Sequence, residues 1–358
     1  MKIAPETVAR QYVPGDMAIQ VSPLGQGLIN DTYRIASEVG NWVLQRLNPE
    51  VFPEPCKVMD NLLTLSEHVQ HKAGEPVSLQ IPLPIFTIEG QPYHLDAEGQ
   101  CWRAIEYIEP SESRQILQND AEAAQVGWAL GHFHRLCSDL PTQSLHDTIP
   151  GFHITPHYFQ SYQQCLQQSV RVDSDSVFDV CADFISRYQS RVVCLEIPRL
   201  QGKLSNRVIH GDPKLNNFLF RPNTDTIISL IDLDTVKPGL PHYDIGDCLR
   251  SCCRDPRDNC FDLRRAKIIL RHYLQEAGAF FQSQDYDYLY SAIWLIPFEL
   301  GIRFFSDYLK GDHYFKTTYP KENLNRAQAQ FTLCDSIEVQ KAELEQTISD
   351  LKSEFCRR

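Results

Sequence analysis

The stretch Val208–Asp234, with the sequence VIHGDPKLNNFLFRPNTDTIISLIDLD, indicates both the fold and the chemistry of this chain. Two apolar runs within it are each followed directly by acids, so we expect Asp212 and Asp232 at the ends of short buried strands. Asn217 lies five positions after Asp212 and fifteen positions before Asp232. Carboxylate and amide oxygens suit magnesium, which takes few protein ligands and leaves positions open for substrate phosphates. The stretch therefore predicts a base that orients a hydroxyl group beside a site for a hard divalent cation.

The composition predicts a folded protein of two lobes or domains. The chain has 358 residues and a formal net charge of -12, without a lysine- or arginine-rich run. This balance argues against nucleic acid and anionic membranes as the main partners. The N-terminus lacks a basic segment followed by an apolar one, and the longest apolar stretch, over residues 289–302, is short and contains Pro297 and Glu299. We therefore expect a soluble cytoplasmic protein; its oligomeric state stays open.

The twelve cysteines do not form a metal or disulfide pattern. The sequence has no C-x-x-C pair, and without an export signal reduced thiols are expected. Cys248, Cys252, Cys253 and Cys260 cluster in sequence. Because free cysteine is a common small buried residue, packing is favoured over metal binding for this cluster.

The N-terminal part of the chain has the pattern of a strand-rich lobe. Residues 19–35 predict two strands joined by a glycine turn, and residues 41–47 predict a third. Apolar residues at helical spacing predict a helix over residues 56–70, and two further strands are expected over residues 81–88 and 101–108. The pattern then changes to helical segments after a proline at position 110. We therefore expect an N-terminal lobe of residues 1–108 and a C-terminal lobe of residues 109–358.

The glycine turn has two interpretations. Gly25 and Gly27, with Asn30 and Thr32 close behind, would let backbone amides approach a phosphate, because glycine has no side chain to block it. An ordinary glycine hairpin has the same pattern. The acids downstream favour the phosphate interpretation.

The motifs resemble those of a known family. His210-Gly211-Asp212 with Asn217, followed by Ile231-Asp232-Leu233-Asp234, resembles the signature of the aminoglycoside phosphotransferase and choline kinase family. Within that family the chain is most similar to bacterial N-acetylhexosamine 1-kinases, through segments that include LGQGLINDTYRI, HGDPKLNN, YDIGDCLR and GIRFFSDYLKGDHYF. The resemblance implies an α+β, two-lobed protein-kinase-like fold. Its N-terminal lobe has an antiparallel sheet and one main helix, and its C-terminal lobe is larger and mainly helical.

The resemblance also implies roles for the acidic residues. It makes Asp212 the base that orients the acceptor hydroxyl, with ATP and magnesium as cofactors. Asn217 and Asp232 are implied as magnesium ligands, with Asp234 assisting, and His210 as a support for its loop.

Nucleotide binding is expected in the N-terminal lobe. The glycine turn and the resemblance together indicate Gly25, Gly27, Asn30, Thr32, Gln45, Arg46, Glu106 and Ile108. In kinases the third strand usually carries a lysine that holds the nucleotide phosphates, and here that position is Gln45, with Arg46 on the opposite strand face. Either Arg46 turns inward, or the glycine turn and the metal suffice. The adenine is expected at backbone groups of residues 106–108, by analogy of fold.

The acceptor site has weaker signals. Arg303 is expected to hold the transferring phosphate or the sugar, although an arginine snorkelling from a helix has the same pattern. Asp244 is expected to bind sugar hydroxyls or to brace its loop, and Asp247 to brace that loop through Arg250.

The sequence as a whole predicts an ATP- and magnesium-dependent kinase that phosphorylates a small molecule. The expected acceptor is the anomeric hydroxyl of an N-acetylhexosamine. Choline, homoserine, an aminoglycoside or another sugar are alternatives with the same chemistry. A nucleotide-binding scaffold without activity is a third possibility, suggested by Gln45, although Asp212, Asn217 and Asp232 argue against it.

Overall fold

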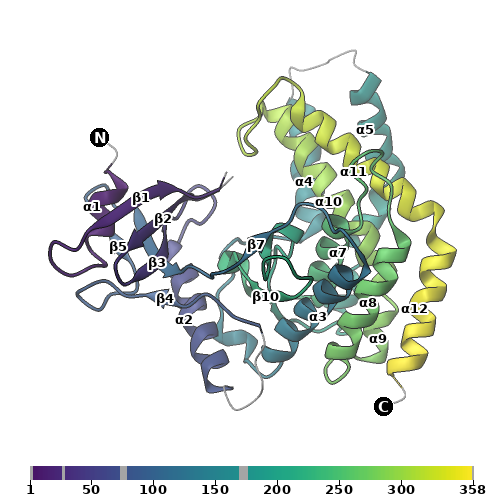
Figure 1. Cartoon of the computed structure of the whole chain (residues 1–358). Coiled ribbons are helices and arrows are strands. Elements are labelled where there is room, and N and C mark those ends of the chain that lie inside the picture. The colour runs from purple at the N-terminus through teal and green to yellow at the C-terminus, as the bar shows by residue number, and fades with distance from the viewer. Residues whose placement is uncertain (1–2, 26–28, 73–78, 169–175, 357–358) are drawn as a thin grey trace.

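The computed structural model describes residues 3–25, 29–72, 79–168 and 176–356, which form two lobes (Figure 1). An antiparallel sheet forms the N-terminal lobe, and most of the remaining chain is helical. This arrangement confirms the α+β, two-lobed fold expected from the sequence. No helix in the described ranges is both long and apolar enough to cross a membrane.

The sheet of the N-terminal lobe has the strand order β1-β2-β3-β6-β4, and β5 also pairs with β6. Its strands are β1 (Ile19–Pro23), β2 (Asp31–Ser37), β3 (Gly40–Arg46), β4 (Pro84–Ile85), β5 (His94–Leu95) and β6 (Cys101–Glu106). The strand expected over residues 81–88 is reduced to the two-residue β4. Prolines at positions 82 and 84 cannot donate hydrogen bonds to a ladder, which explains the short strand.

The two faces of this sheet have different surroundings. Leu44 and Ala104 face a small core that includes Val8 and Ala9 of α1 (Pro5–Ala9). On the other face Thr32 of β2 pairs with Gln45 of β3, and Gln45 pairs in turn with Arg103 of β6. Residues directly opposite each other in a ladder share a face, so these three side chains form a row.

Helix α2 (Pro55–His71) follows the third strand, as expected from its apolar spacing. Proline at the first helical position suits the helix start, and Val58, Leu62 and Leu65 are buried. Asn61 on this helix donates hydrogen bonds to the carbonyl oxygens of His146 and Val236, both at 2.9 Å. Helix α2 is therefore tied to the C-terminal lobe.

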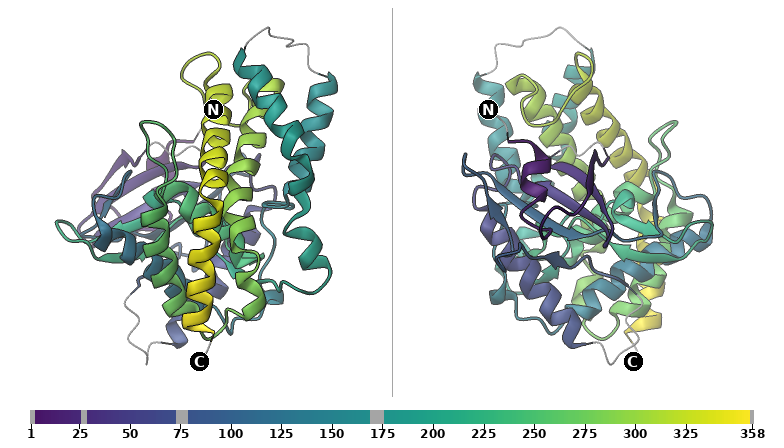
Figure 2. Two further views of the ribbon diagram at one scale, coloured as in Figure 1. Left: turned by 90° about the vertical axis from the view of Figure 1, so that its right-hand side faces the viewer. Right: turned by 60° about the vertical axis from the view of Figure 1, so that its left-hand side comes forward.

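The C-terminal lobe surrounds a large core of aliphatic and aromatic side chains. Its helices are α3 (Asp120–Leu136), α4 (Thr155–Gln168), α5 (Ser176–Tyr188), α6 (Glu196–Leu200), α7 (Pro241–Cys252), α8 (Leu263–Ala277), α9 (Ser283–Tyr286), α10 (Leu289–Lys310), α11 (Glu322–Val339) and α12 (Lys341–Phe355). Figure 2 shows α11 and α12 following one another along the outside of the lobe. Trp294, Phe298 and Phe305 of α10 are buried, so these aromatic residues pack the core.

Two small strand groups carry the motifs. Strand β8 (Arg207–Ile209) pairs with β11 (Lys237–Gly239), and β9 (Phe218–Phe220) pairs with both β10 (Ile227–Leu230) and β7 (Glu112–Ser113). The HGD motif directly follows β8, and Asp232 lies two residues after β10. Both acids therefore lie just beyond strand ends, as their sequence context predicts.

Candidate active site

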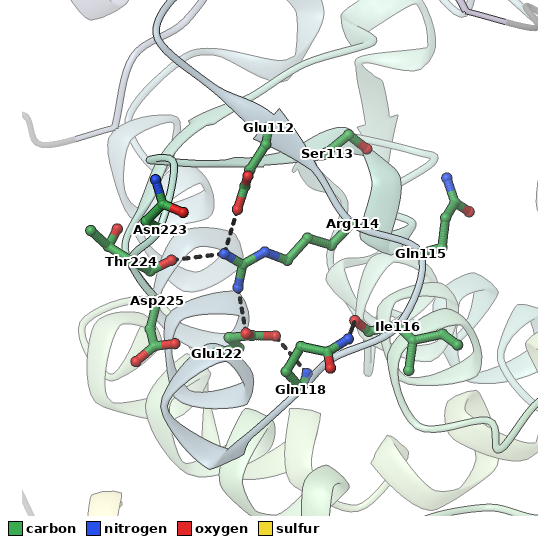
Figure 3. Close-up of a pocket in the computed structure, with 10 residues that line it drawn as sticks. All are labelled: Glu112, Ser113, Arg114, Gln115, Ile116, Gln118, Glu122, Asn223, Thr224 and Asp225. Atoms are coloured by element: carbon green, nitrogen blue, oxygen red, sulfur yellow. Dashed lines mark hydrogen bonds and ion pairs between the residues drawn. The ribbon is translucent and has the colours of Figure 1, made fainter.

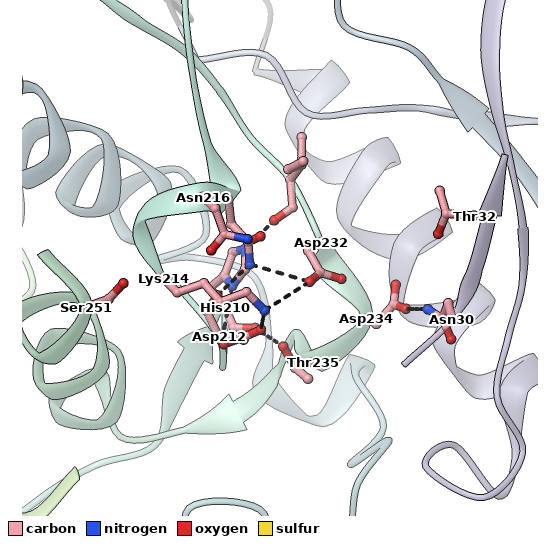
Figure 4. A network of polar contacts seen from close by, with 12 residues as sticks. Asn30, Thr32, His210, Asp212, Lys214, Asn216, Asp232, Asp234, Thr235 and Ser251 are labelled. Carbon is pink, nitrogen blue, oxygen red and sulfur yellow. Dashed lines mark hydrogen bonds and ion pairs between the residues drawn. The ribbon is translucent and has the colours of Figure 1, made fainter. Parts of the chain in front are cut away.

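Asp212 and Asp232 lie near each other with Lys214 between them (Figure 4). The Lys214 ammonium forms an ion pair with the Asp212 carboxylate, and Lys214 Nζ lies 3.6 Å from Asp232 Oδ2. The side chains of Asp212 and Asp232 are 26% and 39% exposed, so both carboxylates can be reached from solvent. The motif reasoning found the two acids but not Lys214. Its position two residues after Asp212 was the available signal.

The protonation of Asp212 suits a base. Burial of most of the side chain raises its pKa to about 6, against the opposing effect of the Lys214 ammonium. A carboxyl group with a pKa near the working pH can accept a proton and release it again. The neighbouring His210 has a lowered pKa because it is buried, which keeps its imidazole neutral.

Asn217 and Asp232 are suitable ligands for a hard cation. Asn217 Nδ2 donates to the Asp212 carbonyl oxygen at 2.8 Å and lies 3.5 Å from Asp232 Oδ2. The amide nitrogen is thus engaged, which leaves the amide oxygen of Asn217 and the carboxylate of Asp232 as candidate ligands. One carboxylate and one amide oxygen are a fitting set for magnesium, which keeps several waters and binds substrate phosphates. The donor chemistry therefore fits the magnesium expected from the resemblance.

Asp234, which was expected to assist the two metal ligands, has both carboxylate oxygens engaged by other residues. Its side chain is 3% exposed, one oxygen is ion-paired with Arg103, and the other accepts from Asn30 Nδ2 at 2.8 Å. Figure 4 shows Asp234 directed toward Asn30 and away from Lys214. The structural reason is the buried arginine of the N-terminal lobe, whose charge Asp234 balances.

Asp244 braces the loop that carries Asp212. Its Oδ1 accepts the Gly211 N–H at 2.8 Å, and its Oδ2 accepts the His210 N–H at 2.7 Å. His134 Nε2 lies 2.8 Å from the same Oδ2, and Asp244 is 0% exposed. Burial alone would raise the pKa of Asp244, but the bonds from His134 and the backbone lower it. Of the two roles expected for Asp244, this placement supports bracing rather than contact with a sugar, because both oxygens accept from protein donors.

Further contacts fix the same loop. His210 Nε2 lies 3.0 Å from the Ile231 carbonyl oxygen, and Thr235 Oγ1 donates to the His210 carbonyl oxygen at 2.8 Å. Gly211 has a φ of +88°, and a Cβ atom there would lie 2.6 Å from the Thr235 carbonyl oxygen. Glycine is therefore required directly before Asp212. The expected role of His210 as a support for the loop agrees with these contacts.

The expected nucleotide residues occupy different environments. Gly25 has a φ of +68°, which suits a tight turn, and Gly27 lies outside the described residues. Asn30 is engaged between Asp234 and the backbone N–H of Asn48, which donates to Asn30 Oδ1 at 3.1 Å. The Asn30 side chain is thus part of the contact between the lobes.

The third strand places Gln45 and Arg46 on opposite faces, as expected. Arg46 forms an ion pair with Asp31, so it does not turn inward. Gln45 Nε2 donates to Thr32 Oγ1 at 3.1 Å, and Gln45 Oε1 accepts from Arg103 Nε at 3.0 Å and Nη2 at 2.7 Å. Arg103 was missed in the sequence, because its relation to Gln45 depends on the pairing of β3 with β6.

The segment expected to hold the adenine borders a hollow of about 680 Å³. Residues 106–109 line it together with Val69 and Gln70 of α2. The Glu106 N–H donates to the Leu83 carbonyl oxygen at 2.9 Å, which fixes the end of β6. Assignment of the adenine to Glu106 and Ile108 stays a prediction.

Arg303 of α10 is surrounded by aromatic rings. Its guanidinium carbon lies 5.2 Å from the Phe152 ring centroid, 5.0 Å from that of Tyr158 and 5.6 Å from that of Phe315. Burial acts to lower the pKa of Arg303, but it is raised overall by neighbouring groups that include Tyr158 and Asp212. The simple snorkelling interpretation therefore does not describe this arginine. The three rings come from distant segments, so sequence reasoning did not find them.

His153 connects this region to the loop of Asp212. Its Nε2 lies 2.8 Å from the Gly211 carbonyl oxygen, and its Nδ1 lies 3.0 Å from Glu299 Oε1. Arg303 follows Glu299 by one turn of α10, so the aromatic cluster around it is held beside the Asp212 loop.

A second hollow, of about 580 Å³, is lined by a different set of residues (Figure 3). Its central Arg114 is ion-paired with Glu112 and Glu122, and it donates to the Thr224 carbonyl oxygen at 2.9 Å. The charge of Arg114 is therefore balanced by residues that line the hollow. None of the residues expected to act in the site lines it.

Residues 20–277 match the phosphotransferase enzyme family whose short name is APH. The chain belongs to this family of phosphotransferases. The match includes the HGD motif, Asn217 and both acids of the Ile231–Asp234 segment, and it covers more than half of the sequence.

Solved structures share the fold over nearly the whole chain. An aminoglycoside phosphotransferase from Alicyclobacillus acidocaldarius has a TM-score of 0.65 and 16% identity, covering 98% of both chains. A microcompartment-associated aminopropanol kinase has a TM-score of 0.62 and 16% identity, covering 95% of this chain and 98% of its own. An aminoglycoside phosphotransferase solved with GDP and kanamycin has a TM-score of 0.55 and 18% identity, covering 97% and 98%. The TM-scores establish a shared fold. Because the identities are low, the acceptor has to be inferred from this chain's own residues.

Proposed function

We propose that this phosphotransferase is an ATP- and magnesium-dependent sugar kinase that acts on the anomeric hydroxyl of an N-acetylhexosamine. Membership of the family supports phosphoryl transfer to a small molecule. The observation that carries the acceptor class is the Arg303 guanidinium, which lies among the rings of Phe152, Tyr158 and Phe315 on the side of the Asp212 loop.

The residues near Asp212 support a direct transfer. Asp212 accepts the proton of the acceptor hydroxyl while the hydroxyl oxygen forms a bond to the terminal phosphorus of ATP. The terminal phosphoanhydride bond breaks at the same time, and ADP is released. Lys214, two residues away, supplies positive charge beside the acids as negative charge shifts to the leaving group. A magnesium ion on Asn217 and Asp232 would neutralise phosphate charge.

The arrangement of Arg303 against its aromatic rings supports a neutral acceptor. Aromatic rings commonly bind ligand cations, but here the protein's own arginine already lies against three of them. A second cation, such as an amino alcohol or an aminoglycoside, would be repelled by this guanidinium. Arginine also presents several donors that suit sugar hydroxyls, an acetamido carbonyl or a transferring phosphate.

A cationic acceptor is the second candidate, because the structural neighbours include kinases named for aminopropanol and for aminoglycosides. An ATP-consumption assay separates the candidates when the acceptors are N-acetylglucosamine, N-acetylgalactosamine, glucose, homoserine, choline, ethanolamine and kanamycin. We expect turnover with N-acetylhexosamines and the product phosphorylated at the anomeric oxygen. Preferred turnover of an amine would overturn the sugar assignment. If the protein binds nucleotide but consumes no ATP with any of these acceptors, the inactive scaffold would be favoured.

A further inference from the structure

A buried arginine stands beside the position where the third strand lacks a cation. Gln45 occupies that position on β3, and a neutral amide cannot balance phosphate charge. The ladder between β3 and β6 pairs Gln45 directly with Arg103, so both side chains lie on the same face of the sheet. A positive charge is therefore present at nearly the same place, but on the neighbouring strand.

The contacts of Arg103 aim it at the boundary between the lobes. Gln45 Oε1 accepts from Arg103 Nε and Nη2 at 3.0 Å and 2.7 Å, which fixes the plane of the guanidinium. Arg103 Nη2 also forms the ion pair with Asp234 of the C-terminal lobe. Arg103 Nη1 makes no hydrogen bond within residues 3–25, 29–72, 79–168 and 176–356. The N–H groups of Nη1 are therefore available to a ligand.

The amide at position 45 fits this arrangement better than a lysine would. A lysine there would place an ammonium against the Arg103 guanidinium and would remove the acceptor for two of the guanidinium N–H groups. Gln45 is itself fixed by its bond to Thr32 Oγ1 at 3.1 Å. The row of Thr32, Gln45 and Arg103 thus forms one hydrogen-bonded unit across three strands.

We propose that Arg103 is the N-terminal lobe's cationic ligand for the nucleotide phosphates, with Gln45 as its positioning residue. Before nucleotide binds, Asp234 balances the buried charge of Arg103; a phosphate oxygen then shares the guanidinium, whose planar fork can bind two acceptors at once. This inference rests on the proposed use of ATP, and it explains how the chain binds phosphate without the lysine.

Relocation of the charge provides the test. Binding of AMP-PNP with Mg²⁺ is measured by isothermal titration calorimetry on the full chain without acceptor. We expect Arg103→Gln to weaken the affinity by about 10- to 100-fold, the range for a lost charge-assisted hydrogen bond. The double variant Gln45→Lys/Arg103→Gln, which restores a cation on β3, should recover most of that loss. In turnover assays the KM for ATP should rise in Arg103→Gln while the KM for the acceptor stays unchanged.

Arg114→Gln is the matched control. It also removes an arginine from a buried carboxylate, Glu122, but at the separate hollow of Figure 3, and it should leave AMP-PNP affinity unchanged. Arg103→Lys keeps the charge and guards against misfolding of Arg103→Gln; it should bind the nucleotide more tightly than Arg103→Gln.

The possible outcomes separate this inference from the proposed function. Wild-type protein that binds no AMP-PNP would overturn the proposed function itself. Wild-type binding together with unchanged affinity in folded Arg103→Gln would overturn only the role of Arg103, leaving it a structural tie to Asp234. A folded double variant that stays as weak as Arg103→Gln would also count against the inference, because charge at this place would then not be what binds phosphate.

Discussion

Lys214 Nζ lies 3.6 Å from Asp232 Oδ2 while its ammonium is ion-paired with Asp212. One cation is therefore shared between the candidate base and a candidate metal ligand. In the absence of metal and nucleotide, this sharing reduces repulsion between two acids that the reaction needs close together.

Asp212→Asn should lower kcat by about 10² to 10⁴, the usual contribution of a general base. The amide keeps the size of the side chain but cannot accept the hydroxyl proton. Steady-state assays measure the loss, and circular dichroism checks the fold. The control is Asp225→Asn, at an exposed aspartate that accepts a hydrogen bond from Asn119, and it should retain wild-type turnover. A purified Asp212→Asn protein with near wild-type kcat would exclude Asp212 as the base.

The pH dependence should reveal Asp212 and its cation. Because the pKa of Asp212 is raised to about 6, the base is ionised above that pH, and kcat/KM should fall as pH decreases through 6. Lys214→Gln removes a neighbouring positive charge, which raises the pKa of the carboxyl further. The acid limb of the Lys214→Gln profile should therefore shift to higher pH. A shift to lower pH, or identical acid limbs in both proteins, would contradict this account of the ion pair.

Asp232→Ala should weaken the response to magnesium. Loss of a carboxylate ligand is expected to raise the magnesium concentration for half-maximal turnover about tenfold or more, and to lower maximal turnover as well. Titration of MgCl₂ at fixed ATP measures both effects. A magnesium titration curve that matches the wild type would exclude Asp232 as a ligand.

Asp244→Asn should lower the free energy of unfolding rather than weaken substrate binding directly. The change places an NH₂ or a weaker acceptor against three donors, from His210, Gly211 and His134, and should cost about 2–4 kcal/mol of the free energy of unfolding. Urea denaturation measures this cost. A variant with wild-type stability and a raised KM for the sugar would indicate that Asp244 binds the acceptor instead.

Arg303→Gln should raise the KM for the sugar about tenfold or more, because a charged multidentate donor is replaced by a neutral amide. Arg326→Gln is the comparison, since Arg326 also lies against an aromatic ring, that of Phe304 at 5.7 Å, but it is paired with Glu322. It should leave the KM for the sugar unchanged. Equal effects of the two substitutions would indicate a loss of packing rather than of acceptor binding.

Local sequence patterns were sufficient to predict a residue's position where its neighbours in space are also close along the chain. The strand ends that carry Asp212 and Asp232 and the helix α2 follow from short patterns. Arg103 could not be found in this way, because its relation to Gln45 and Asp234 depends on strand pairing and on contact between lobes. Asp244 was ambiguous for the same reason, since sequence spacing does not indicate that its carboxylate faces the backbone of residues 210 and 211.

The acceptor side and the phosphoryl-transfer side of the site are encoded in separate segments. Arg303 and its rings come from α10, α4 and two connecting segments, whereas Asp212, Lys214 and Asn217 lie within six residues of one loop. If the proposed function holds, substitutions at Arg303 and at the residues that surround it can change which molecule is admitted while residues 212–217 stay the same. A change of acceptor would then require coordinated substitutions in several segments, whereas the short loop could be kept whole.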